Sequence, residues 1–248
     1  MPRVARKKSE SGYYHIILRG INKQNIFYDD EDRKVLLNRI KLFKEKVGFK
    51  VVAFCLMTNH VHLLIKEERV PVGTIIGRIL SSYVYWYNSK YERVGHLFQE
   101  RFRSEAIEKD DYLLCCVRYI LQNPVKAKLC DSVWEYKWSS ANLILKEGKS
   151  FVDDQLIKGM LQDQTKQFIE QENEDKFLEW ESKIKYTDEK MQQKVKKTLN
   201  NVDVYSIKEL DKEKRNKLLK KIMQIDGISI RQASRMTGAP ISAIRHLQ

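Results

Sequence analysis

The sequence predicts an α+β fold, an antiparallel sheet with helices packed on it, followed by a C-terminal all-α domain. Short segments rich in aromatic and β-branched residues alternate with longer segments of helical periodicity over residues 13–122, the pattern of a layered domain. Two strand-like segments are separated only by a short polar break, which indicates a hairpin and therefore antiparallel pairing. Beyond about residue 153 the composition changes and the remaining periodicity is helical.

The first predicted elements are a strand, a helix and a hairpin. Tyr13–Arg19 is dominated by residues that favour strands. Residues 29–47 begin with acidic side chains, end with cations and carry apolar residues at helical spacing, as expected of a helix that covers the sheet. Residues 51–66 read VVAFCLMTNHVHLLIK, two apolar runs joined by a turn at Thr58-Asn59.

A second helix, a further strand and a third helix follow. Residues 72–91 form a helix whose later part is aromatic, and these rings either pack in the core or offer a surface on which bases stack. Residues 95–108 alternate as a strand does. Residues 110–122 form a compact helix with an acidic start, and Pro124 is expected to end it.

The chain is expected to divide into four parts. Residues 1–12 form a basic disordered arm, and residues 13–150 form the main domain, whose aromatic tail packs against its core. Residues 151–202 form a helical connector with a break at Asn200-Asn201. Residues 203–248 form a DNA-binding domain in which a basic helix over residues 207–226 precedes a helix-turn-helix.

The helix-turn-helix prediction rests on residues 228–248, ISIRQASRMTGAPISAIRHLQ. Gly238 allows the turn between two short apolar-periodic helices. The second helix would lie in a DNA groove and offer Ser242, Arg245 and His246. A helical hairpin used for protein contact is the alternative, but the excess of cations in this domain favours DNA.

The charge and composition point to a nucleic-acid partner. The 248 residues carry a net charge of +13, a surplus that favours polyanions. The cations are spread through mixed-charge segments and no apolar run reaches the length of a membrane span, so we expect no membrane association. Four cysteines without a C-x-x-C pair argue against a zinc finger or disulfide framework. With no secretory signal, we expect a cytoplasmic, nucleoid-associated protein.

His60-Val61-His62 is a candidate metal site. Because side chains alternate along a strand, His60 and His62 share one face, and neutral imidazole is a common metal ligand. The alternative is a pair of ordinary half-buried strand histidines. We interpret His15, in the first strand, as a partly buried histidine and not as a ligand.

His60-Val61-His62 is followed on a helix by Tyr119 and Asn123, and these residues belong to a series of ordered segments: YYHIILRGINKQNIFYDDEDR, FCLMTNHVHLLI, GHLFQERFRS, YLLCCVRYILQNPVKAKL and YKWSS. Together these features resemble the one-tyrosine HUH (IS200-like) transposases, and within that family the REP-associated tyrosine transposases. The likeness covers residues 13 to about 140.

The resemblance implies a ferredoxin-like sheet with the histidines on a central strand and the tyrosine on a facing helix. It implies that His60, His62 and Asn123 hold Mg²⁺ or Mn²⁺, with Asn123 standing where relatives often have Gln. Tyr119 would be the catalytic nucleophile and form a 5′-phosphotyrosine link. Because a free phenol has a pKa near 10, Tyr119 needs a nearby cation, and the metal site, Arg118 and Lys126 are the candidates.

Substrates of the family that this chain resembles are single-stranded DNAs with hairpins, such as REP-like or insertion-sequence ends. We expect the protein to bind such DNA as a monomer or homodimer. The candidate phosphate contacts in the first part of the chain are Arg101, Arg103, Lys126, Lys128 and the arm residues Arg3, Arg6, Lys7 and Lys8.

Three functions remain open from sequence. The first is a metal-dependent single-strand DNA endonuclease and strand transferase. The second is a cleavage-inactive, sequence-specific DNA-binding protein. The third is a metal phosphodiesterase that uses water, in which Tyr119 is only structural.

Overall fold

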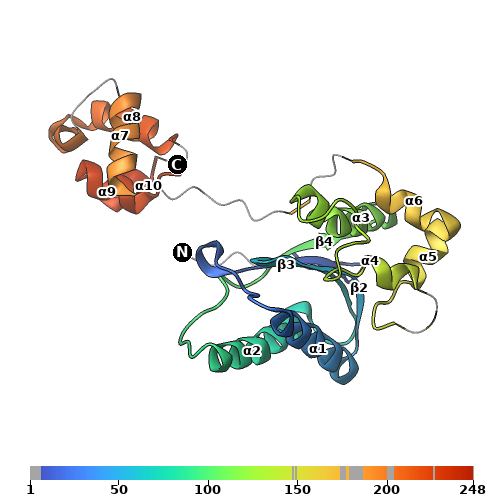
Figure 1. Cartoon of the computed structure of the whole chain (residues 1–248). Coiled ribbons are helices and arrows are strands. Elements are labelled where there is room, and N and C mark those ends of the chain that lie inside the picture. Colours follow the sequence, from blue (N-terminus) through green and yellow to red (C-terminus); the bar gives the residue numbers. More distant parts are fainter. Residues whose placement is uncertain are drawn as a thin grey trace. The chain divides into compact units, whose positions relative to one another are not determined.

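The computed structural model describes residues 7–146, 148, 150–173, 177–178, 187–199, 204–225 and 227–247. The chain forms two compact units, residues 1–180 and residues 181–248 (Figure 1). Within the described residues, each unit has its own cluster of buried apolar side chains. The described helices include none that is long and apolar enough to cross a membrane.

The first unit is built on a four-stranded sheet with the order β2-β3-β1-β4. The strands are β1 (Tyr13–Arg19), β2 (Phe49–Leu56), β3 (His60–Glu67) and β4 (Arg103–Ile107). All three neighbouring pairs are antiparallel, which confirms the predicted α+β fold. Strand β4 is shorter than the expected 95–108, because the backbone of the segment before it forms only an isolated bridge, between Gly20 and Phe98, and no continuous ladder.

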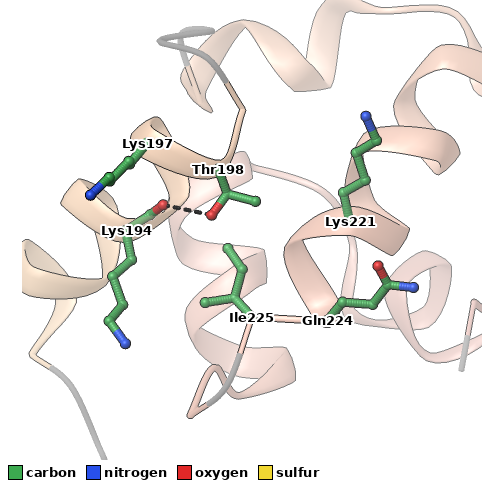
Figure 2. A pocket seen from close by; sticks show the side chains of 6 residues that line it. All are labelled: Lys194, Lys197, Thr198, Lys221, Gln224 and Ile225. Carbon is green, nitrogen blue, oxygen red and sulfur yellow. Dashed lines mark hydrogen bonds between the residues drawn. The ribbon is translucent and has the colours of Figure 1, made fainter.

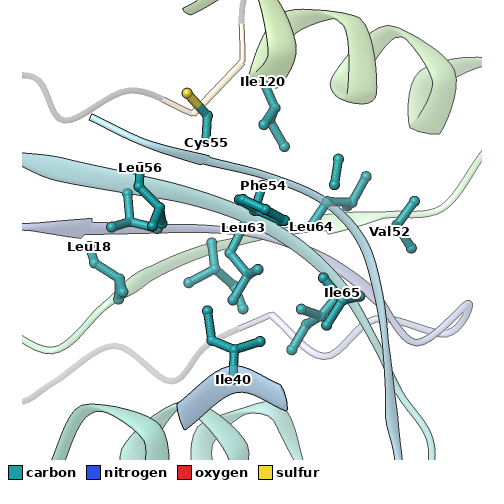
Figure 3. Packing of buried hydrophobic residues seen from close by; sticks show 14 of the residues in the cluster. Leu18, Ile40, Val52, Phe54, Cys55, Leu56, Leu63, Leu64, Ile65 and Ile120 are labelled. Carbon is teal, nitrogen blue, oxygen red and sulfur yellow. The ribbon is translucent and has the colours of Figure 1, made fainter. Parts of the chain in front are cut away.

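Helices cover both faces of this sheet. Helices α1 (Asp30–Val47) and α2 (Val72–Lys90) lie on one face and α3 (Asp110–Lys126) on the other (Figure 1). The close view shows Leu18, Leu63 and Ile40 packed on the first face and Cys55 near Ile120 on the second (Figure 3). Of the aromatic rings of α2, Tyr83 and Tyr87 are buried in the core, while Tyr85 is exposed.

The sequence predicted that helix α3 ends before Pro124, but the helix continues to Lys126. The prediction was wrong because Pro124 lies in the last turn, where it removes a single backbone hydrogen bond. The side chain of Asn123 donates to the carbonyl of Tyr119 at 2.8 Å and stabilises this turn. The helix therefore carries Tyr119 and Asn123 one turn apart on a rigid element.

The aromatic tail packs on the sheet, as predicted. Leu56 N donates to the carbonyl of Trp138 at 2.9 Å, and the hydroxyl of Tyr136 donates to the carbonyl of Leu56 at 2.8 Å. Short helices follow: α4 (Ala141–Leu145), α5 (Gln155–Leu161), η2 (Gln162–Gln164) and α6 (Thr165–Glu170). A single 3₁₀ turn, η1 (Ile21–Lys23), follows β1.

The end of the basic arm is ordered where we expected disorder. Glu108, just after β4, accepts hydrogen bonds from the backbone N–H groups of Glu10 and Ser11. Ser9 is buried and its backbone N–H donates to the hydroxyl of Tyr14 at 2.8 Å. This part of the arm is held because it pairs with a carboxylate at the sheet edge. Arg3 and Arg6 lie outside the described residues.

The second unit is helical. Its elements are α7 (Asp188–Thr198), η3 (Val204–Glu209), α8 (Lys212–Met223), α9 (Ile230–Thr237) and α10 (Ile241–Arg245). The basic helix expected over 207–226 is divided, because Asp211 caps the N-terminus of α8 by accepting from Lys214 N. Gly238 ends α9 at φ 67°, a left-handed conformation that favours glycine. The predicted break at Asn200-Asn201 lies outside the described residues.

Candidate active site

A pocket of about 370 Å³ opens between β1, β3 and α3. It is lined by Ile17, Arg19, Asn59, His60, His62, Tyr119 and Asn123. The register explains the convergence: His60 and His62 lie opposite Arg19 and Ile17, so all four share the sheet face that α3 covers. The structure thus brings together the four residues that sequence singled out for chemistry.

The two histidines of β3 have nearly perpendicular rings, with 5.1 Å between ring centroids. Asn59 orients the first. Its Nδ2 donates to the carbonyl of Lys23 at 3.2 Å, so its Oδ1 faces Nδ1 of His60 at 2.7 Å. An amide oxygen only accepts, so Nδ1 of His60 carries the proton and Nε2 retains its lone pair. Burial, followed by the nearby Arg19, lowers the pKa of His60 to about 4, and this ring is neutral at neutral pH.

His15 lies in direct contact with His62, which the sequence interpretation missed. Nε2 of His15 is 3.0 Å from Nδ1 of His62, and the two rings are stacked. His15 is fully buried and His62 is 3% exposed. Burial lowers the pKa of each imidazole below its ordinary value. His15 shares the face of His62 by the alternation of β1, a signal that needs the strand register before it can be used.

Tyr119 faces the histidines from α3. Its ring centroid is 5.6 Å from that of His62 and 5.0 Å from that of Phe177. Phe177 is a second residue that sequence reasoning missed, since nothing in the pattern around it indicates a contact with the site. The hydrogen bond from Nδ2 of Asn123 to the carbonyl of Tyr119 leaves Oδ1 as the oxygen acceptor of this amide.

The structure separates the two cations proposed to activate Tyr119. The ammonium of Lys126 lies over the Tyr119 ring, 5.4 Å from its centroid. Arg118 instead packs over the ring of Phe168 at 4.5 Å and donates to the side chain of Gln171 at 3.2 Å. Lys126 therefore contacts the ring of Tyr119 from the same helix.

The donor set fits a divalent cation. Two neutral imidazoles and one amide oxygen suit Mn²⁺, and Mg²⁺ less well because it prefers oxygen ligands. Across the described residues, no group of three or more His, Cys, Asp or Glu side chains is arranged to hold a metal. A cation at this pocket would therefore rely on His60, His62 and Asn123.

The candidate DNA contacts are distributed over several surfaces. Arg103 pairs with Ile17 across the sheet and so lies beside the pocket, with Arg19 as a further cation that we did not predict. Burial and the nearby Arg103 lower the pKa of Arg19. The other predicted contacts within the described residues are exposed: Arg101, Lys126, Lys128, Lys7, Lys8, Ser242, Arg245 and His246.

The second unit has a hollow of about 600 Å³ between α7 and α8 (Figure 2). Its lining is Lys194, Lys197, Thr198, Lys221, Gln224 and Ile225, which includes three lysines and no acid. The hydroxyl of Thr198 donates to the carbonyl of Lys194 at 2.9 Å and holds the end of α7. The sequence interpretation did not single out this surface.

Comparison with known proteins agrees with this geometry. Residues 8–123 match the family described as "Transposase IS200 like". No curated protein matches the chain. A solved structure described as that of "the REP associates tyrosine transposase bound to a REP hairpin" is 18% identical in sequence, with a TM-score of 0.51, and the match covers 61% of this chain and 90% of that chain. At this identity the likeness shows a shared fold.

Proposed function

The region of residues 8–123 belongs to the IS200-like transposase family, and from this premise we propose that the protein is a metal-dependent single-strand DNA endonuclease and strand transferase. The observation that carries the proposal is the pocket itself. A tyrosine from one helix, two imidazoles from one strand and an amide line the same cavity, although they are far apart in the sequence. A nucleophile beside a cation-binding donor set is the arrangement that phosphoryl transfer requires.

The proposed step is attack of the Tyr119 hydroxyl oxygen on the scissile phosphorus. The new bond joins this oxygen to phosphorus, and the bond from phosphorus to the 3′ oxygen breaks. The phenolic proton passes to solvent, and the departing 3′ oxygen takes up a proton from solvent. The products are a 5′-phosphotyrosine link and a free 3′ hydroxyl, and because the phosphodiester energy is retained, a second 3′ hydroxyl can reverse the step without ATP.

The residues of the pocket divide this work. The ammonium of Lys126 favours the phenolate form of Tyr119. His60, His62 and Asn123 would hold Mg²⁺ or Mn²⁺, which when bound polarises the phosphate and stabilises the leaving 3′ oxygen. Arg19 lies at the wall of the pocket and supplies positive charge toward the phosphate.

We propose hairpin-bearing single-stranded DNA as the substrate, bound by a monomer or a homodimer. The solved relative is described as bound to a REP hairpin. Arg101, Arg103 and Lys128 would contact phosphates of the strand that enters the site, and Lys7 and Lys8 would extend this contact.

The second unit would add DNA affinity in two ways. If α9 and α10 act as a helix-turn-helix, Ser242 and Arg245 of α10 and His246 just after it, all exposed, would face a groove. The lysine-lined hollow between α7 and α8 would hold backbone phosphates through charge (Figure 2). A domain that binds near the cleavage point raises the effective concentration of substrate at the first unit.

The test is a search for a covalent adduct. The protein is incubated with labelled hairpin-bearing single strands and Mn²⁺ and then run on a denaturing gel. We expect a shifted, protease-sensitive band that disappears in Tyr119→Phe. Tyr85→Phe is the matched control, because Tyr85 is an exposed tyrosine on α2. Helix α2 lies on the face of the sheet opposite to α3 and Tyr119. The Tyr85→Phe variant should leave the band intact.

Two other outcomes would select the alternative functions. Cleavage that requires metal but gives no adduct, and survives Tyr119→Phe, would indicate a water-using phosphodiesterase. Tight hairpin binding with no cleavage across a broad set of sequences would indicate a cleavage-inactive DNA-binding protein.

A further inference from the structure

A row of polar side chains runs from the buried His62 through the buried His15 to the partly exposed Glu105. Nδ1 of His62 lies 3.0 Å from Nε2 of His15, and Nδ1 of His15 lies 3.7 Å from Oε2 of Glu105. The sheet register aligns them, since His15 in β1 pairs directly with Glu105 in β4. Within the described residues, Nδ1 of His15 has no hydrogen-bond partner, so the carboxylate at 3.7 Å is the charge that this nitrogen faces.

One proton is shared between the two rings. The 3.0 Å contact needs one ring nitrogen that donates and one that accepts, and in a neutral imidazole the other nitrogen of the same ring takes the opposite role. If Nε2 of His15 donates, its Nδ1 presents a lone pair to the Glu105 carboxylate, and Nε2 of His62 carries a proton. If Nδ1 of His62 donates, Nδ1 of His15 presents N–H to the carboxylate, and Nε2 of His62 retains its lone pair.

Hydrogen bonds fix the position of Glu105, so its charge can favour one of these two arrangements of the ring protons. The hydroxyl of Tyr112 donates to its Oε1 at 2.7 Å, and the backbone N–H of Leu178 donates to its Oε2 at 3.0 Å. Burial would raise the pKa of Glu105, but the contacts with His15, Tyr112 and Leu178 together hold it below its ordinary value. The group is therefore a carboxylate, and a lone pair pointed at it is repelled while an N–H is attracted.

We propose that Glu105 and His15 are positioning residues that set the ring protons of His62, so that its Nε2 keeps the lone pair required to bind a metal. The inference rests on the proposed metal-dependent function, which gives that lone pair its use. Both histidines of β3 then carry their ring proton on Nδ1. Asn59 fixes the proton of His60, and the His15–Glu105 pair fixes the proton of His62.

The direct test reads the proton positions in the metal-free protein. Long-range ¹H–¹⁵N correlation spectra distinguish a ring nitrogen that bears a proton from one that bears a lone pair, and the chain has only five histidines to assign. We expect the Nδ1–H form for both His15 and His62 in the wild type. A wild-type spectrum with the proton on Nε2 of His62 would overturn the proposal without the need for any variant.

The second test measures Mn²⁺ binding by calorimetry. Glu105→Gln offers His15 an amide that can donate or accept, so the preference is lost. We expect mixed proton positions on His62 and a 10- to 100-fold weaker affinity, the usual effect of an outer-shell partner. Glu105→Asp keeps the charge and should restore the proton position and most of the affinity. Glu68→Gln, which removes an exposed carboxylate paired with Lys50, is the matched control and should change neither.

The outcomes separate this inference from the proposed function. Equal Mn²⁺ affinity and unchanged ring protons in a folded Glu105→Gln protein would refute the positioning role even if wild-type protein forms the tyrosine adduct. Tyr112→Phe removes one hydrogen bond to Glu105 but keeps the carboxylate. It should weaken Mn²⁺ binding and shift the ring protons of His62 in the same direction but by less, and it replaces Glu105→Gln as the test if that variant does not fold. Loss of the adduct in the wild type, with the expected ring protons present, would refute the strand-transfer reaction alone.

Discussion

The ammonium of Lys126 lies over the ring of Tyr119, 5.4 Å from its centroid, and the two residues are on the same helix two turns apart. This contact gives the phenol a neighbouring positive charge that does not depend on a bound metal. Lys126 is exposed and lies one turn beyond Asn123, a residue that lines the pocket.

We expect Lys126→Gln to slow adduct formation about tenfold at neutral pH, the effect of roughly one pKa unit on the phenol. Because a cation favours the phenolate, its loss should move the rising limb of the pH–rate profile to higher pH, and Lys126→Arg should restore it. Single-turnover rates between pH 6 and 10 measure this. Lys109→Gln, which changes an exposed lysine at the other end of the same helix, is the control. An unshifted pH–rate profile would show that Lys126 does not assist ionisation of Tyr119.

We expect His60→Ala to abolish the response of cleavage to added metal and to weaken Mn²⁺ binding by more than about 100-fold, beyond what loss of an outer-shell partner costs. One of the two imidazole ligands is then missing. His96→Ala is the matched control, since His96 is exposed and lies outside the pocket. Calorimetry checks the affinity. Wild-type activity that is equal with and without metal would contradict the assignment.

We expect Asp32→Ala to lower the free energy of unfolding by about 3 kcal/mol, because it breaks a buried charged network. The Asp32 carboxylate is fully buried and accepts from Nζ of Lys90 and from the hydroxyl of Tyr91, each at 2.9 Å. Asp30→Ala on the same helix removes only an exposed pair with Lys137 and should cost less than about 1 kcal/mol. Urea unfolding measures both, and equal losses would show that the network adds nothing.

We expect replacement of Lys194, Lys197 and Lys221 by Gln to weaken DNA binding at low salt and to reduce the salt dependence of the affinity. Each lost phosphate contact should lower the slope of log K against log salt by about 0.7 to 0.9. Adduct formation at saturating DNA should be unchanged. The same change at three exposed lysines of the first unit that lie away from the pocket, Lys34, Lys41 and Lys146, is the control. A slope equal to that of the wild type would show that the hollow does not bind DNA.

Local patterns in the sequence determined the elements and the faces of their residues. The alternation of β3 put His60 and His62 on one side, and the spacing of four residues put Tyr119 and Asn123 on one side of α3. The bounds of β1, α1 and α2 follow equally local signals, such as the capping box at Asp29. These features depend on backbone periodicity, which a single segment contains.

Tertiary structure alone decided which faces meet. The pairing of His15 with Glu105, and the contact of Phe177 with Tyr119, join segments that are distant in the chain. Strand register and helix placement are set by the packing of the whole core, and a shift of one residue would turn His15 away from His62. For the same reason the sequence suggested both Arg118 and Lys126 as partners of Tyr119, and only the packing of α3 against Phe168 on one side and the sheet on the other placed Lys126 there.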